Sequence, residues 1–173
     1  GYQPVQPVAY SHRLHVGELG LDCRYCHASV ESSAVANVPP TQTCMNCHQT
    51  VKRDSPALAP IRESMQSGRP MRWIRVHKIP EYAYFTHNMH VAASIGCVTC
   101  HGRIDEMEVV TQVAPLSMSW CLDCHRNPDP YRRPLSEITN MRWTPPRDAA
   151  GLAAQLARER PGAPPTDCSG CHR

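Results

Sequence analysis

Five copies of one short pattern, Cys-x-x-Cys-His, constrain this 173-residue chain more than any other feature. Numbered here as sites 1 to 5, they are Cys23-Arg-Tyr-Cys26-His27, Cys44-Met-Asn-Cys47-His48, Cys97-Val-Thr-Cys100-His101, Cys121-Leu-Asp-Cys124-His125 and Cys168-Ser-Gly-Cys171-His172, and together they hold all ten cysteines. The pattern is the attachment signature of c-type haem, in which both thiols bond to the porphyrin and the histidine becomes the proximal iron ligand. The sequence therefore predicts five covalently bound haem c groups.

Three other uses of paired cysteines explain the pattern less well. A disulfide framework accounts for the even number of cysteines but not for a histidine after every second one. Zinc ribbons join two Cys-x-x-Cys units around one ion, and five units cannot be divided into pairs. Redox-active dithiols usually occur singly, beside a βαβ pattern. We therefore interpret the chain as a pentahaem cytochrome c.

The composition favours a fold built around these groups, because large apolar side chains are scarce. The chain has a single Phe and 17 Pro. Such a chain needs staples or bulkier groups to form an interior. We expect a mainly irregular fold with short α-helices, a multihaem cytochrome c fold organised around a covalent haem core, and little or no sheet.

Two helices are predicted outside the haem sites. One runs from Ser55 as N-cap, through Pro56 in the first turn and Ile61 and Met65 on one face, to Gly68. The other begins at Asp148, places Leu152 and Leu156 on one face and ends at Pro161-Gly162. Between the first helix and the third haem site, residues 72–85 read as extended chain interrupted by proline.

An internal repeat organises the chain. A displacement of about 75 residues lays "YSHRLHVGELGLDCRYCH" at 10–27 on "FTHNMHVAASIGCVTCH" at 85–101, and repeated units of this kind stabilise one another by packing. Each module reads His-x-x-His followed by two haem sites. The predicted organisation is a tether at 1–10, dihaem module 1 at 11–55, a connector at 56–80, dihaem module 2 at 81–128, and a linker, helix and fifth haem site at 129–173.

Five histidines remain once the proximal ones are assigned: His12, His15, His77, His87 and His90. Their number equals the number of irons, and four of them form the duplicated His-x-x-His pairs, so we expect all five to be axial ligands. Residues three apart on a helical turn project to the same side. An iron that already has a proximal ligand accepts only one of the two, so each turn should bridge two haems.

The ligand set of the fifth haem stays open between His77 and Met141. Residues 126–167 contain no histidine, and Met141 is their one methionine. A Met/His haem has a higher potential than a bis-His haem, so ligation by Met141 would mark the electron exit. The remaining methionines are expected to fill the core: Met45, Met65, Met71, Met89, Met107 and Met118.

Charge and compartment narrow the function. The formal net charge is +3, and every basic residue except Lys52 and Lys78 is Arg, a side chain suited to pairing with haem propionates. The sequence has no stripe of basic residues that would indicate binding to nucleic acid. Covalent haem attachment takes place outside the cytoplasm, so the chain should face the periplasm. No apolar stretch is long enough to span a membrane, and because the sequence begins at Gly1 we expect a signal or anchor upstream.

The chain over residues 8–173 resembles the pentahaem cytochrome subunit of bacterial alternative complex III. The resemblance rests on "VPPTQTCMNCHQT", "VHKIPEYAYFTHNMHV", "CHGRIDEMEVV", "PLSMSWCLDCHRNPDP" and "ITNMRW", together with the first haem segment. It implies an electron-transfer subunit, without catalysis of its own, that relays electrons from a quinol-oxidising respiratory or photosynthetic complex to a periplasmic acceptor. It also implies an N-terminal membrane anchor and several partners: an iron–sulfur/molybdopterin-like subunit, quinol-oxidising membrane subunits, a monohaem cytochrome and a soluble electron acceptor.

The modules also resemble small class III-type multihaem cytochromes. That resemblance implies that His12 caps the haem on Cys23 and Cys26, and that His87 caps the haem on Cys97 and Cys100. It leaves the haems capped by His15 and His90 open.

Two other function classes remain as alternatives. A multihaem reductase of nitrite or a similar oxyanion often replaces a proximal histidine by lysine, whereas all five motifs here end in His. A free periplasmic shuttle would be a monomer with charged docking faces, and the two-module pattern alone does not exclude it.

Overall fold

The computed structural model describes residues 1–160 and 162–172. Its α-helices are α1 (Cys23–Cys26), α2 (Thr41–His48), α3 (Ala59–Ser67), α4 (His87–Ala92), α5 (Cys97–His101), α6 (Met118–Arg126), α7 (Ala149–Glu159) and α8 (Cys168–Cys171). A π-helix, η1 (Arg13–Glu18), and four 3-10 turns, η2 (Pro56–Leu58), η3 (Ile104–Glu106), η4 (Asp129–Tyr131) and η5 (Leu135–Glu137), complete the set. The described chain forms no sheet, only the isolated bridges Ala83 to His172 and Ile95 to Arg132. The predicted fold of short helices in irregular chain is confirmed.

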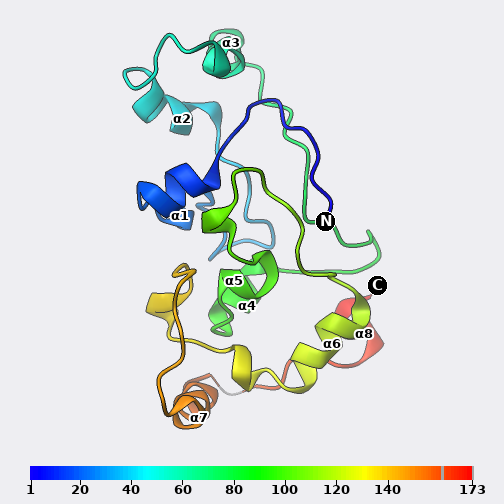
Figure 1. The fold of residues 1–173 in the computed structure, drawn as a ribbon. Helices are drawn as coiled ribbons and strands as arrows, with labels where there is room; N and C mark the ends of the chain where they lie inside the picture. The colour runs from blue at the N-terminus through cyan, green and yellow to red at the C-terminus, as the bar shows by residue number, and fades with distance from the viewer. Residues whose placement is uncertain (161, 173) are drawn as a thin grey trace.

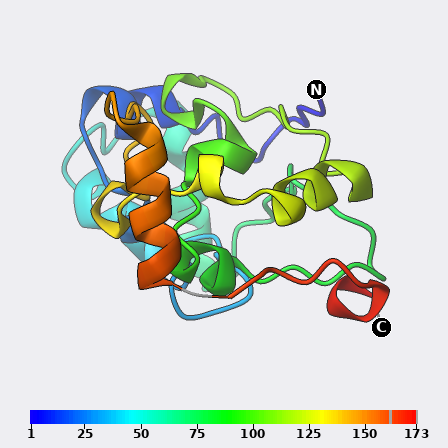
Figure 2. The same ribbon diagram turned by 90° about the horizontal axis from the view of Figure 1, so that it is seen from below.

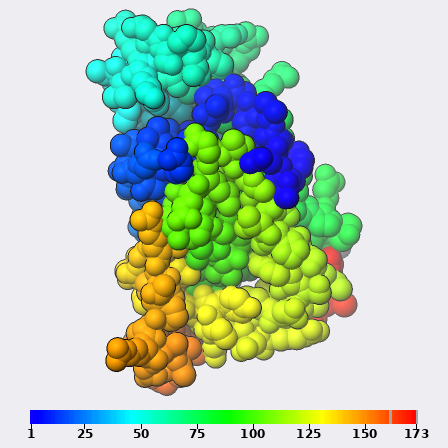
Figure 3. All heavy atoms as spheres, viewed as in Figure 1, coloured from blue at the N-terminus to red at the C-terminus, as the bar shows by residue number. Residues whose placement is uncertain are grey.

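The helices follow one another along the length of the molecule and do not pack into layers. In Figure 1, α2 and α3 lie together at one end, α1 follows, α4 and α5 occupy the middle, and α6 and α8 lie toward the other end. Helix α7 packs against η4, and Figure 2 shows it crossing one side of the molecule while α8 stands apart at the C-terminus. The space-filling view in Figure 3 shows the α2–α3 segment as a separate lobe.

The two modules cap each other's helices. The first backbone N–H groups of α4, those of His87 and Asn88, donate to the carbonyls of Ala34 and Ser33 in the loop after site 1. In the same way Arg13 N, at the start of η1, donates to Met107 O in the loop after site 3. Helix starts leave such donors without partners inside the helix. Reciprocal capping therefore gives a physical reason for the packing of one repeat on the other.

Both helices predicted outside the haem sites are present. Helix α3 ends at Gly68, which adopts a left-handed conformation with φ of 69°, and Ile61 is buried as expected while Met65 is exposed. Helix α7 begins at Asp148, whose carboxylate accepts a hydrogen bond from Gly151 N. The predicted end of this helix at Pro161 lies outside the described residues.

The interior that the protein chain itself provides is small. Its buried apolar side chains are Val8, Ile61, Ile95, Ile138, Met141 and Leu156. Met65, Met89 and Met118 are exposed, so within the protein chain alone they do not have the core-filling role predicted for them. In the described part of the chain, no helix has the length and apolar character needed to span a bilayer.

The N-terminal segment, predicted as a tether, lies along the body of the protein. The Gln6 amide exchanges two hydrogen bonds with the Ile74 backbone, at 2.8 and 2.9 Å. Gln3 Nε2 donates to Val109 O at 3.1 Å, and Val8 is buried. The hydrogen bonds of these two glutamine side chains therefore hold the segment against the rest of the protein.

We expect Leu156→Ala to destabilise the protein, because Leu156 is only 3% exposed and lies on α7, which packs against η4. Truncating a buried leucine typically lowers the free energy of unfolding by about 2 to 5 kcal/mol. Denaturant unfolding followed by far-ultraviolet circular dichroism measures the loss. Leu152→Ala, on the same helix but half-buried, is the control, and an equal loss there would show that Leu156 is not the anchor of α7.

Candidate metal centres

Each Cys-x-x-Cys-His pattern lies on a short helical turn. Asp22, Ser117 and Asp167 cap α1, α6 and α8 by accepting hydrogen bonds from the backbone N–H groups of Arg24, Trp120 and Gly170. A helical turn brings residues three apart to one side, so each site presents its two thiols together, with the histidine directly after them. All ten cysteines are free thiols in the structure.

Three of the proximal histidines face a second imidazole at a regular spacing. The ring centroids are 6.2 Å apart for His15 and His48, 6.4 Å for His87 and His101, and 6.0 Å for His90 and His125. Metal–imidazole bonds are about 2 Å long, so two imidazoles on opposite faces of one metal have centroids roughly 6 Å apart. The spacing in all three pairs therefore fits one iron between the two rings.

Most of the histidines are oriented by a hydrogen bond from Nδ1 to a backbone carbonyl. Seven make one, at 2.6 to 3.0 Å: His15 to Ser11, His27 to Asn37, His48 to Val51, His87 to Ala34, His90 to Thr86, His125 to Pro165 and His172 to Tyr82. A carbonyl can only accept, so the proton is on Nδ1 and the lone pair is on Nε2. This is the arrangement that metal-binding imidazoles commonly have.

An aromatic ring supports each His-x-x-His turn in the same way. Tyr10 stacks on His15, with centroids 4.4 Å apart, and meets His12 edge-on at 4.8 Å. Phe85 lies 4.4 Å from His90 and meets His87 edge-on at 4.8 Å. The alignment of the histidines in the repeat did not pair these two rings with them. The sequence does contain a pattern that predicts these contacts, because each aromatic residue stands two positions before the first histidine of its pair.

Burial keeps several imidazoles neutral. It lowers the pKa of His101 to about 3 and that of His12 to about 4, and neighbouring histidines add smaller effects. The pKa values of His77 and His90 are also lowered, mainly by burial. Neutral imidazole is the form that binds metal, so the interior favours the ligating state without a bound proton.

Site 1 has a candidate partner in His12. The His27 imidazole contributes, after burial, to the lowered pKa of His12, so the two rings are neighbours. The Nδ1 atom of His12 is buried without a hydrogen-bond partner in the described structure. In the repeat, His12 and His27 correspond to the pair His87 and His101.

The two candidates for the fifth ligand lie elsewhere in this structure. The His77 ring is 4.4 Å from that of His101, and its buried Nε2 has no hydrogen-bond partner among the described residues. Met141 is buried in the segment from which Thr139 bonds Asp22, next to site 1. The ring that lies against His172 is Tyr82, at 5.7 Å.

The effects of the thiols on one another's pKa values show which sites are neighbours. Burial and then Cys44 raise the pKa of Cys26, which joins sites 1 and 2. The Cys97 thiol raises the pKa of Cys23, which joins sites 1 and 3. After burial, Cys124 raises the pKa of Cys100, which joins sites 3 and 4, and Cys171 raises that of Cys121, which joins sites 4 and 5. The order in space is therefore 2, 1, 3, 4, 5, which can be followed in Figure 1 through α2, α1, α5, α6 and α8.

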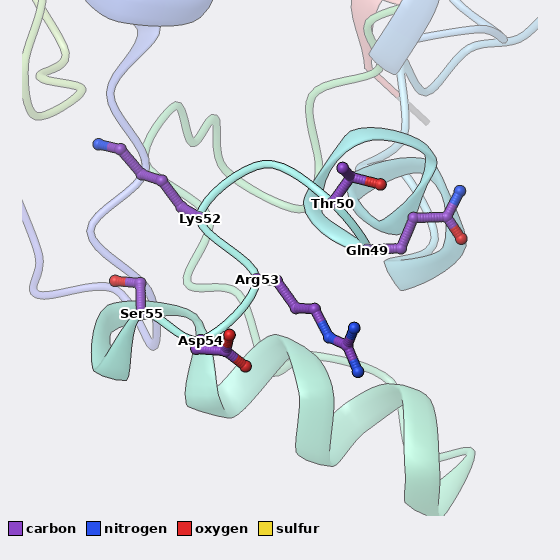
Figure 4. Close-up of a pocket in the computed structure, with 6 residues that line it drawn as sticks. All are labelled: Gln49, Thr50, Lys52, Arg53, Asp54 and Ser55. Carbon is purple, nitrogen blue, oxygen red and sulfur yellow. The ribbon is translucent and has the colours of Figure 1, made fainter.

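Two surface hollows lie beside site 2. One, of about 730 Å³, is formed by the loop between α2 and η2 and is lined by Gln49, Thr50, Lys52, Arg53, Asp54 and Ser55 (Figure 4). The other, of about 270 Å³, includes His48, Met45, Arg53 and Arg62 in its lining. The first has a hydrophilic lining without cysteine or histidine, whereas the second opens directly onto a proximal histidine.

Within the described residues, His, Cys, Asp and Glu side chains do not gather in groups of three or more that could hold a metal ion. The histidines come in pairs instead. Paired imidazoles suit haem iron, because the porphyrin supplies the other metal bonds. The side chains of the sites therefore fit covalently bound haem c: paired thiols, oriented imidazoles, and buried nitrogens on His12 and His77 that lack partners.

Comparison with known proteins agrees with this geometry. The model of the family described as cytochrome c7 and related cytochrome c matches residues 83–173. The multihaem cytochrome c subunit of menaquinone reductase from Nitratidesulfovibrio vulgaris (strain Hildenborough) is 33% identical to the chain over 100 residues, 57% of this chain and 47% of that protein. The chain thus spans about half the length of this relative. With its matched region covering more than half of its residues, the chain belongs to the family of cytochrome c7 and related cytochromes c.

Proposed function

We propose that this multihaem cytochrome carries five haem c groups, one bound to the cysteine pair of each site, and acts as an electron relay. The proximal ligands are His27, His48, His101, His125 and His172. The distal ligands of sites 1 to 4 are His12, His15, His87 and His90, in that order. The observation that carries the proposal is the set of three imidazole pairs with centroids 6.0 to 6.4 Å apart.

The proposed ligand pairs make each module a unit of two haems. In module 1 the His12–His15 turn serves sites 1 and 2, and in module 2 the His87–His90 turn serves sites 3 and 4. Iron with two imidazoles has no position left for a substrate. These four haems would transfer electrons but would not bind a small molecule, which favours a relay over a reductase.

The proposed complex is a membrane complex that oxidises quinol, with this chain on the periplasmic side of the inner membrane. The relative named above is a subunit of a menaquinone reductase, which supports assembly with quinone-reactive partners. The sequence resemblance to alternative complex III supports the finer identity, with an iron–sulfur/molybdopterin-like subunit, quinol-oxidising membrane subunits and a monohaem cytochrome as neighbours, and a soluble acceptor beyond them.

The relative named above is a subunit of a menaquinone reductase. Its name favours the opposite direction of electron flow, toward a quinone. A row of haems conducts either way, since the direction depends on the potentials of the donor and acceptor at its ends. The alternative function is therefore the same relay, delivering electrons toward a quinone-reducing module.

We expect His90→Ala to alter two haems. Site 4 loses its distal ligand and becomes high-spin, while site 3 is disturbed because its ligand His87 shares helix α4 with His90. Low-temperature electron paramagnetic resonance of the oxidised protein, with the total haem count from the pyridine haemochrome spectrum, measures both effects. The control is Met89→Ala on the same helix, at an exposed side chain. A single altered haem would show that the turn does not bridge two sites.

The sixth ligand of site 5 stays a prediction from the sequence, His77 or Met141, since the structure places His77 against His101 and Met141 in the segment next to site 1. Near-infrared absorption of the oxidised protein distinguishes the two. Sulfur-ligated low-spin haem has a charge-transfer band that bis-imidazole haem lacks. If Met141 is the ligand, the wild type shows the band and Met141→Leu loses it. If the wild type lacks both the band and high-spin iron, His77 is the ligand, and His77→Ala should then produce one high-spin haem.

The complex is tested by isolating native membranes in mild detergent and following the haem absorbance. The proposal predicts that the cytochrome co-purifies with integral membrane proteins that react with quinol or quinone. Recovery of all the cytochrome in the soluble fraction, with none retained by the washed membranes, would instead indicate a free shuttle.

A further inference from the structure

An arginine is buried at the centre of the row of sites. Arg133 is only 6% exposed. Its backbone N–H donates to Ser94 O at 2.9 Å, its guanidinium lies 4.9 Å from the centroid of the Trp143 ring, and its Nη1 donates to Asn140 O at 3.1 Å. These contacts fix a positive charge inside the protein.

This charge has little compensation within the described protein. Nε of Arg133 is buried and has no hydrogen-bond partner there. Glu137 is the acidic residue that acts on it, but its effect is weaker than those of burial and of Cys97. Burial lowers the pKa of the guanidinium, the direction expected for a cation that loses water without gaining a full counter-charge. Arginine nevertheless stays protonated, so the charge remains.

The position of the charge is set by Gly96, the residue before the first cysteine of site 3. A Cβ atom on Gly96 would overlap the Nε and Cζ atoms of Arg133, so glycine leaves the space in which the guanidinium lies. The charge also acts on the neighbouring thiol: Cys23, and to a smaller extent the charge of Arg133, lower the pKa of Cys97. The guanidinium therefore lies at the attachment edge of site 3, where sites 1 and 3 meet.

We infer that Arg133 raises the reduction potential of the haem at site 3. The inference rests on the proposed function, because it requires haem c at this site. Ferric haem carries one more positive charge than ferrous haem, so a fixed cation nearby disfavours the ferric state. Burial strengthens the effect, since charges interact more strongly in an interior of low dielectric constant than in water. Arg133 thus acts as a tuning residue at the junction between the two modules.

The experiment is a potentiometric titration of the five-haem protein, followed by optical and paramagnetic resonance spectra, for the wild type, Arg133→Met and Arg133→Lys. The site 3 component is assigned from His87→Met, which changes the ligand of that haem. At a fixed ambient potential we expect Arg133→Met to raise the ferric-to-ferrous ratio of site 3 at least tenfold, which for a one-electron couple is about 59 mV. Arg133→Lys keeps the charge and should restore most of the ratio.

Arg132→Met is the matched control. Arg132 is also buried and its Nε also lacks a hydrogen-bond partner among the described residues, but it forms an ion pair with Asp129 at 3.3 Å and its Nη1 bonds Arg160 O. This variant should leave the site 3 ratio close to the wild-type value. If Arg133→Met does not fold, Gly96→Ala, which displaces the guanidinium without removing it, should raise the ratio in the same direction. An unchanged site 3 ratio in whichever variant folds would overturn the inference, whereas fewer than five haems in the wild type would refute the proposed function instead.

Discussion

The separation of paired imidazoles is the constraint on which the arrangement of this protein depends. A chain with few buried apolar side chains cannot position its helices by packing alone. Here the helices are short, and many of them either carry a Cys-x-x-Cys-His site or a His-x-x-His turn. Placing two rings roughly 6 Å apart fixes the distance and orientation of the helices that carry them. One loop of module 1 orients an imidazole of each module, because the carbonyls of Asn37 and Ala34 bond His27 and His87.

The repeat gives this arrangement its symmetry. Tyr10 with His12 and His15 is reproduced by Phe85 with His87 and His90, and each turn donates backbone hydrogen bonds to the loop of the other module. The equivalent cysteines Cys23 and Cys97 are neighbours between the modules, since Cys97 raises the pKa of Cys23. Any electron that travels between the outer sites 2 and 5 would cross this junction, and the buried charge of Arg133 lies beside it.

The local features of the fold were predictable from the sequence, whereas the features that depend on tertiary contacts were not. Helix α7 was predictable because Asp148 caps it and Leu152 and Leu156 recur at helical spacing, and α3 because Gly68 ends it. The imidazoles that face His15 and His90 were not predictable. A His-x-x-His turn fixes the side to which its two imidazoles point, but not which haem sites lie on that side in the folded protein. The order 2, 1, 3, 4, 5 depends on how the modules meet, and the position of His77 against His101 follows from an irregular segment without periodicity.

The most direct test of the relay is an iron anomalous difference map from crystals of the haem-loaded protein. The proposed relay predicts five iron positions in one row, with sites 2 and 5 at its ends and sites 1 and 3 adjacent at its centre. Each of the irons at sites 2, 3 and 4 should lie between the paired histidines. Fewer than five irons, or an iron at site 1 separated from site 3 by another haem, would contradict it.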